Sequence, residues 1–277
     1  MPGKLYLCAT PIGNLKDVTL RVLETLAAVD YIVAEDTRRT KKLTAHFDIK
    51  KRVVSFHDAN ELKALPKIIA DLQAGRTIAQ VSDAGLPGIA DPGHRLVKAC
   101  IDGGIPFEVL PGPSALLTAA VLSGLPTDDI RFLGYFPRKT GARKRLLADL
   151  SEARSTLVFY EAPHRLVATL TDIAAGFAGR RVFIGRELTK RFEEHLRGSA
   201  AELLEELKER EVKGELVIVI AGQREPTITL APEELIKEID REIGGGKSKS
   251  DAIKIVSTHH GLSKRFVYDL AHGSKST

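Results

Sequence analysis

Residues 81–93, VSDAGLPGIADPG, are the stretch of the chain best suited to binding a small molecule. They follow a short apolar run and combine three glycines, two prolines and two aspartates with no lysine or arginine. Glycine lets the backbone approach a ligand closely, and proline fixes the shape of a loop before binding. Carboxylates accept hydrogen bonds from amines and hydroxyls. The composition therefore predicts a site for a ligand with hydrogen-bond donors and positive charge, with a tight structural turn as the alternative.

Phosphate is not the group that this loop is suited to bind. A phosphate site usually needs a lysine, or a helix N-terminus preceded by glycines. The sequence has no G-x-x-x-x-G-K-[ST] motif, and TPIGN follows the first apolar run where a G-x-G-x-x-G would be expected. A magnesium-dependent phosphotransferase that uses Asp83 and Asp91 is therefore disfavoured, and no metal site is predicted.

Short apolar runs alternate with amphipathic segments over the first 124 residues. An apolar run bounded by turn residues predicts a buried strand, and apolar residues three or four positions apart predict a helix. Strands that alternate with helices form a parallel sheet with helices on its faces. The predicted strands are 4–10, 31–36, 51–57, 77–83 and 106–112, and the predicted helices are 17–29, 59–74, 94–104 and 113–124.

Polar or glycine-rich loops follow all five of these predicted strands. The carboxyl ends of parallel strands meet at one edge of a sheet, so we expect the loops to lie together there. Each loop alone could be ordinary turn chemistry, and the prediction depends on their convergence. The loops are 10–14, 34–40, 56–61, 81–93 and 111–115.

The remainder of the chain differs from this pattern. Strand-like runs at 131–136, 156–162, 180–188 and 215–222, with helices at 164–177 and 199–211, predict a mixed sheet. A helix at 231–243, a glycine-rich hinge at 244–251 and two short helices around Gly261 predict a helical tail compatible with a helix-turn-helix. We therefore expect an α/β protein with domains at 1–122, 123–223 and 224–277.

Basic residues gather in three segments of a chain whose formal net charge is only +5. These segments are 38–52, 138–145 and 244–277. The second of them, RKTGARKR, is predicted to form a mobile basic loop. Such clusters favour a polyanionic partner, with solvated surface as the alternative for each one. No apolar run approaches the roughly 18 residues that span a bilayer, so a cytoplasmic protein is expected. Cys8 and Cys100 have apolar neighbours and are expected in the core.

Seven motifs together resemble one known family. ATPIGNLKD, AEDTRRT, FHDANE, VSDAGLPGIADPG, VLPGPSA, FYEAPHR and GRELTKRFEE occur in this order between residue 4 and about residue 222. In this the chain resembles the ribosomal RNA methyltransferases of the tetrapyrrole (corrin/porphyrin) methylase superfamily, and the helical tail is also similar. The resemblance implies a class III S-adenosylmethionine methyltransferase fold with two α/β domains. It further implies 2'-O-methylation of a cytidine in 16S ribosomal RNA, within the 30S subunit, by a homodimer.

The same resemblance assigns the cofactor S-adenosyl-L-methionine to the strand-end loops. This donor carries a sulfonium, an α-amino group and an adenine but no phosphate, as the loop at 81–93 would require. The second domain is expected to close the pocket. The implied cofactor-binding residues are Ser82, Asp83, Ala84, Gly85, Pro87, Ile89, Asp91, Pro111, Gly112, Ser114, Ala115, Tyr160, Glu161 and Ala162.

A ribose hydroxyl is a poor nucleophile, so a general base would help its methylation. Glu35, Asp36 and His57 are the candidates, with the two carboxylates ranked above the histidine. An equally good interpretation is that Glu35 and Asp36 cap a helix and pair with an arginine.

RNA contacts are expected from basic side chains, because phosphate contacts supply affinity without sequence choice. Arg165 and Arg186 could equally form ion pairs. The rival functions are methylation of a tetrapyrrole or of a modified protein histidine, and RNA binding without catalysis. The candidate RNA-binding residues are Arg38, Arg39, Arg138, Lys139, Arg143, Lys144, Arg145, Arg165, Lys264 and Arg265.

Overall fold

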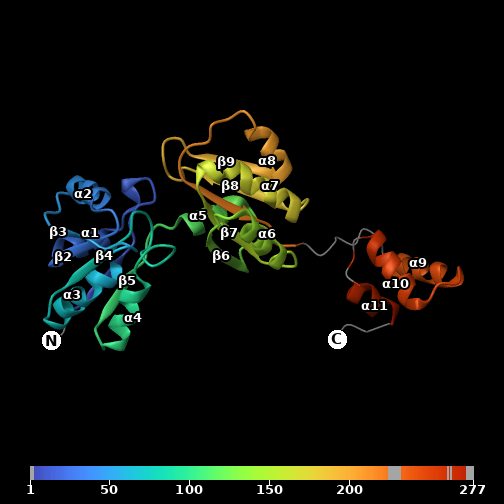
Figure 1. The fold of residues 1–277 in the computed structure, drawn as a ribbon, viewed down its shortest axis with the longest axis horizontal. Coiled ribbons are helices and arrows are strands. Elements are labelled where there is room, and N and C mark those ends of the chain that lie inside the picture. Colours follow the sequence, from blue (N-terminus) through green and yellow to red (C-terminus); the bar gives the residue numbers. More distant parts are fainter. Residues whose placement is uncertain (1–2, 224–231, 261, 263, 273–277) are drawn as a thin grey trace. The chain divides into compact units, whose positions relative to one another are not determined.

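A computed structural model describes residues 3–223, 232–260, 262 and 264–272 (Figure 1). The chain divides into two compact units, Met1–Gly222 and Gln223–Thr277. The first unit contains two β-sheets and the second contains helices only, over the residues described.

The first sheet is entirely parallel and has the strand order β3-β2-β4-β1-β5. Its strands are short, and β2 and β4 are buried along their whole length because helices cover both faces. This confirms the parallel sheet that the sequence predicts. The strands are β1 (Leu5–Cys8), β2 (Tyr31–Ala34), β3 (Arg52–Ser55), β4 (Ile78–Val81) and β5 (Phe107–Leu110).

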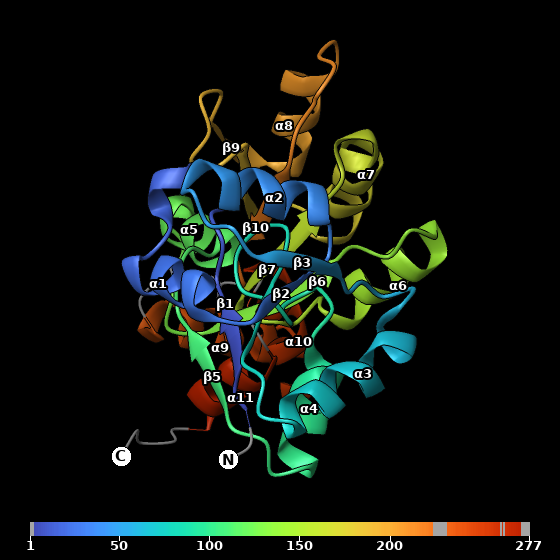
Figure 2. The ribbon, with the colours of Figure 1, turned by 90° about the vertical axis from the view of Figure 1, so that its left-hand side faces the viewer.

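Four helices connect these strands: α1 (Leu20–Ala28), α2 (Thr37–His46), α3 (Glu61–Gln73) and α4 (His94–Asp102). Leu26 of α1 and Leu43 of α2 pack in one buried cluster, and Leu72 of α3 and Leu96 of α4 pack in another, on opposite faces of the sheet. Figure 2 shows α1 and α2 above and to the left of α3 and α4. Cys8 and Cys100 are both buried, one in each of these cores, as the sequence predicts.

The second sheet has the order β6-β7-β10-β8-β9 and mixes directions, as predicted. Only β6 and β7 are parallel, whereas β10 runs antiparallel to both β7 and β8. The edge strand β9 was not predicted, because its sequence EHLRGS holds a single buried apolar residue, Leu196. The strands are β6 (Ile130–Tyr135), β7 (Thr156–Glu161), β8 (Arg181–Arg186), β9 (Glu194–Ser199) and β10 (Leu216–Ile220).

The helix α5 (Ala115–Ser123) packs on one face of this second sheet, where Ala119 contacts the cluster of Phe183 and Val219. The predicted boundary at residue 122 assigns α5 to the first domain, and the exact domain limits stay a prediction. The opposite face is covered by α6 (Thr140–Asp149), α7 (Leu166–Gly176) and α8 (Ala200–Leu207).

The expectation of a mobile loop at 138–145 is wrong, because α6 begins at Thr140. Arg143 is buried, and its Nε donates to Asp172 of α7 at 2.6 Å. The ion pair ties α6 to α7 across 29 residues of sequence. A window of basic residues cannot reveal such a distant acidic partner.

The second unit is built from α9 (Pro232–Gly244), α10 (Lys249–His259) and α11 (Lys264–Ala271) around a core that includes Leu235, Val256 and Val267. This confirms the helical tail. The predicted hinge is shorter than expected, because α10 begins at Lys249. Gly261, the predicted turn, lies outside the described residues. No helix in the described part of the chain is long and apolar enough to cross a membrane.

Candidate active site

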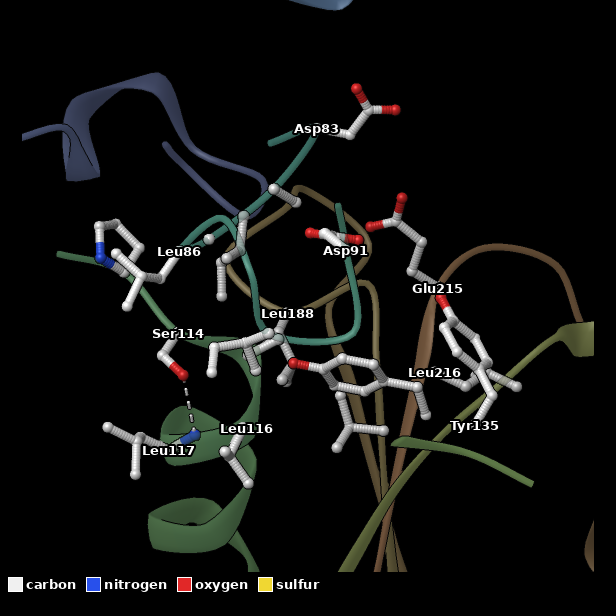
Figure 3. A pocket seen from close by; sticks show the side chains of 18 of the residues that line it. Asp83, Leu86, Asp91, Ser114, Leu116, Leu117, Tyr135, Leu188, Glu215 and Leu216 are labelled. Carbon is white, nitrogen blue, oxygen red and sulfur yellow. Dashed lines mark hydrogen bonds between the residues drawn. The ribbon is translucent and has the colours of Figure 1, made fainter. Parts of the chain in front are cut away.

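A cavity of about 660 Å³ lies where strand-end loops of the first sheet meet the second sheet (Figure 3). Four of the five predicted loops contribute to its lining, and only 56–61 does not. The strand-end convergence predicted from the sequence therefore occurs. The lining residues are Ile12, Glu35, Arg39, Asp83–Leu86, Ile89, Asp91, Pro111–Leu117, Tyr135, Tyr160–Pro163, Leu188 and Gly214–Val217.

The loop after β4 is fixed by the end of β1. Thr10 and Gly85 exchange two backbone hydrogen bonds, at 2.8 and 3.0 Å. The hydroxyl of Ser82 donates to the Gly85 carbonyl at 3.1 Å, and that of Thr10 donates to the Ser82 carbonyl at 3.1 Å. Gly85 has a φ of +80°, a conformation that residues with a side chain rarely adopt. The shape of the loop therefore requires glycine at this position.

The loop after β5 approaches the end of β1 closely. A Cβ atom on Gly112 would lie 2.8 Å from the Cβ of Ala9, which is too close for two carbons. Ser114 then caps α5 by accepting a hydrogen bond from the backbone N–H of Leu117 at 3.4 Å, drawn as the dashed line in Figure 3. Gly112 and Ser114 thus place the start of α5 against the cavity.

Five carboxylates line the cavity: Glu35, Asp83, Asp91, Glu161 and Glu215. Figure 3 shows Asp83, Asp91 and Glu215 at one end, away from the apolar Leu116 and Leu117. Arg39 is the one cationic side chain among the described lining residues, and it lies 3.6 Å from Asp83 and 3.5 Å from Glu215. The cavity is therefore acidic at one end and apolar at the other.

This environment changes the ionisation of the carboxylates. Burial, and then repulsion from Glu35 and Asp83, raises the pKa of Asp91 to about 7. Burial and the neighbouring Asp83 and Asp58 also raise the pKa of Glu35. A cation bound at this end would favour the charged carboxylates and lower both pKa values. The site is thus suited to a positively charged ligand.

The second sheet contributes two tyrosines, with ring centroids 5.6 Å apart, to the cavity wall. Burial raises the pKa of Tyr160 to about 12 and also raises that of Tyr135. Both phenols therefore remain protonated at neutral pH and can donate hydrogen bonds.

Two of the three predicted general bases do not line the cavity. Asp36 caps α2 by accepting from the backbone N–H of Arg38 at 2.8 Å, and it pairs with the Arg38 guanidinium. These contacts hold its pKa well below the usual range. Asp36 therefore caps a helix and pairs with an arginine, which is the structural alternative to a general base. His57 follows β3, at the one loop that does not reach the cavity, and only Glu35 lines it.

Two of the predicted cofactor contacts, Ser82 and Pro87, do not line the cavity. Ser82 instead holds the loop together through its hydroxyl. Glu161 lines the wall, but its carboxylate is already bonded within the second half of the unit. It accepts from the Ala162 N–H at 2.8 Å and the Thr169 hydroxyl at 2.6 Å, and it pairs with Arg165 at 3.2 Å.

Two of the predicted RNA-binding arginines are engaged inside the protein. Arg143 is paired with Asp172, and Arg165 is paired with Glu161 and donates to the carbonyls of Phe136 and Pro137. These two guanidinium groups are therefore engaged by protein partners and are not expected to bind RNA. Arg39 is exposed but also lines the cavity, and the side chain of Arg265 lies outside the described residues. The remaining candidates are exposed: Arg38, Arg138, Lys139, Lys144, Arg145 and Lys264.

Sequence reasoning missed the contribution of Tyr135, Leu188 and residues 214–217 to the cavity. Because β10 runs antiparallel to β7, the beginning of β10 lies beside the end of β7, with Leu216 opposite Glu161. The direction of β10 is the signal that would have placed Glu215 in the site.

A parallel α/β sheet joined to a mixed one, with a cavity at the carboxyl ends of the parallel strands, is the architecture of a two-sheet class of α/β proteins, and this edge of a parallel sheet is where such proteins bind ligands. Within that class, the chain belongs to the Tetrapyrrole (Corrin/Porphyrin) Methylases, whose family model matches residues 4–204. This confirms the family and the fold that the motifs imply.

The curated relatives share one name. The chain is 44% identical to "Ribosomal RNA small subunit methyltransferase I" of Halalkalibacterium halodurans, over 98% of this chain and 95% of that protein. It is 43% identical to the protein of the same name from Synechocystis sp., over 97% of each.

Solved structures share the fold at lower identity. The methyltransferase CobJ has a TM-score of 0.61 at 19% identity, covering 80% of this chain and 96% of that one. Uroporphyrin-III C-methyl transferase from Thermus thermophilus, complexed with S-adenyl homocysteine, has a TM-score of 0.58 at 17% identity, covering 79% and 97%.

Proposed function

We propose that the chain transfers a methyl group from S-adenosylmethionine to the 2'-hydroxyl of a cytidine in small-subunit (16S) ribosomal RNA. The observation that carries this proposal is the match to relatives named as small-subunit ribosomal RNA methyltransferases along 98% of the chain at 44% identity. That match extends beyond residue 204, where the family model ends, and so includes the helical tail.

The chemistry of the cavity fits the methyl donor. S-adenosylmethionine supplies a methyl group on a cationic sulfonium and also carries a cationic amino group. The carboxylates of Asp83, Asp91 and Glu215 suit these charges. The backbone at Gly85 and Gly112 would contact the donor at close range, as glycine allows. The cavity has no lysine among its described lining residues, which agrees with a ligand that lacks phosphate.

Glu35 is the proposed acceptor of the ribose hydroxyl proton. It lines the cavity, and its raised pKa makes the carboxylate a stronger base than Asp36, whose pKa is held low by Arg38. The remaining contribution of the chain is positioning, because methyl transfer is an in-line displacement that requires a defined alignment. Glu35→Gln should reduce kcat with little effect on donor affinity, whereas Asp36→Asn should leave kcat close to the wild-type value.

The exposed basic residues of the first unit support contact with the RNA backbone. Arg138, Lys139, Lys144 and Arg145 lie on α6 or immediately before it, and Arg38 lies on α2. Lys264 of α11 is a further proposed contact, from the second unit. These side chains would supply affinity that falls with salt, and the cavity would supply the choice of sugar.

The test is methylation of 30S subunits and of protein-free 16S RNA with radiolabelled donor, followed by nuclease mapping. We expect label on the 2'-oxygen of one cytidine, with the 30S subunit as the better substrate. Label on a base or on protein would overturn the proposed substrate. Absence of donor binding to the purified chain would overturn the proposed cofactor.

A homodimer in the cytoplasm is part of the proposal, since ribosomal subunits are assembled there. Exposed apolar side chains on the edge strand β5 and on α5 support self-association: Phe107, Val109, Leu117 and Val121. Light scattering should give twice the chain mass, and Val121→Lys should shift it toward the monomer.

A further inference from the structure

The second unit brings two histidines and a glutamate together, apart from the proposed active site. Glu238 lies on α9, His259 is the last residue of α10, and His260 follows directly. One potential ligand atom from each residue lies within 4.8 Å of the others. The three side chains are partly or fully exposed, so an ion can reach them from solvent.

The three side chains of this cluster are already close to one another. His260 Nε2 lies 2.6 Å from Glu238 Oε2, and the two histidine rings have centroids 4.6 Å apart. Imidazole nitrogens and carboxylate oxygens bind Zn²⁺ at about 2.0–2.2 Å, and two histidines with one glutamate form a known three-residue ligand set for zinc. Ligand atoms around such an ion lie about 3.3 Å apart when the geometry is tetrahedral. A metal would therefore take the place of the proton between His260 and Glu238, whose ligand atoms would separate by about 0.7 Å to admit it, and the exposed His259 ring would move closer.

We propose that Glu238, His259 and His260 bind one Zn²⁺ ion, with water as the fourth ligand. The proton displaced from the histidine–glutamate pair passes to solvent when the ion binds. The ion would join the end of α10 to the middle of α9, beyond the apolar contacts of Leu235, Ile239 and Val256. A unit that spans only residues 223–277 has a small core, and small cores commonly depend on such cross-links.

The test is a zinc titration of the full-length chain without an affinity tag, after treatment with a chelator, in competition with a chromophoric chelator. We expect one zinc ion per chain and at least about tenfold weaker binding in His259→Gln, His260→Gln and Glu238→Gln. His272→Gln is the matched control, because this histidine belongs to the same unit but its ring stacks on Tyr268. That variant should bind zinc as the wild type does.

A second measurement distinguishes a metal site from a hydrogen-bonded pair. Hydrogen exchange in α9 and α10 should slow when zinc is added to the wild type, and should not respond in His259→Gln, whose exposed ring can be changed without unfolding the helices. Equal zinc affinity in the wild type and His259→Gln would overturn the proposal. So would an unchanged exchange rate at a zinc concentration that saturates the protein.

Discussion

The guanidinium of Arg39 lies 3.5 Å from the carboxylate of Glu215. The contact joins α2, beside the first sheet, to the segment that precedes β10 in the second. The same guanidinium lies 3.6 Å from Asp83, at the acidic end of the cavity. Both ion pairs are partly exposed and therefore weak, so a ligand cation can compete with Arg39 for the two carboxylates.

Replacing Arg39 with glutamine should move the pH dependence of kcat upward. The positive charge of Arg39 lowers the pKa of Glu35, and its removal lets this proposed base hold its proton to a higher pH. The rate of methyl transfer at saturating donor, measured between pH 5 and 9, should show the shift. Arg38→Gln is the control, since Arg38 pairs with Asp36 outside the cavity. An equal shift in both variants would contradict a specific role for Arg39.

Asp91→Asn should stabilise the chain at high pH in the absence of donor. The folded pKa is about 7 and the ordinary value is 3.8, so the unfolded chain releases this proton first as the pH rises. Stability is therefore lost between about pH 4 and 7, and the loss is constant above that range. Melting temperatures should agree for variant and wild type at pH 4, and the variant should melt higher at pH 8.

The Asp36→Asn variant should show the opposite effect on stability at high pH. Arg38 lowers the folded pKa of Asp36, so its contribution to stability is present above about pH 4 and is lost as the pH falls. This variant should melt lower than the wild type at pH 8. A rise in melting temperature would contradict the ion pair described for Arg38.

Arg143→Ala should destabilise the chain by about 3 kcal/mol, because it leaves the buried Asp172 with only the exposed Lys144, 4.0 Å away, as a cationic partner. Arg145→Ala, an exposed change on the same helix, should alter stability by less than about 0.5 kcal/mol. Urea denaturation measures both. RNA binding should show the opposite pattern. Arg145→Ala should fold normally but should reduce the affinity for RNA and the salt dependence of that affinity.

Gly112→Ala should destabilise the chain by about 1–3 kcal/mol and weaken donor binding. The added methyl group would meet Ala9 at 2.8 Å and force apart the ends of β1 and β5. Gly141→Ala in α6 is the control, because its Cβ would meet nothing within 4 Å. That change should be neutral or stabilising by up to about 1 kcal/mol, since alanine favours a helix.

The first sheet and most of its cavity loops could be predicted because both signals are local. Buried runs such as YIVA mark the strands, and glycine, proline and acidic residues follow them directly. The second half depends on contacts between distant residues. The partner of Arg143 lies 29 residues away, and Glu215 enters the site only because β10 runs antiparallel to β7. Neither relationship can be read from a short window of sequence.

Each sheet comes from one uninterrupted stretch of chain, β1–β5 from residues 5–110 and β6–β10 from residues 130–220. A nascent polypeptide can therefore complete the first sheet on the ribosome before translation of the second is finished. Glu215 and Val217, which close the cavity, are synthesised almost last in the first unit. A ligand of this cavity would consequently protect only a chain that extends past residue 217 against unfolding, and chains terminated earlier would gain nothing from it.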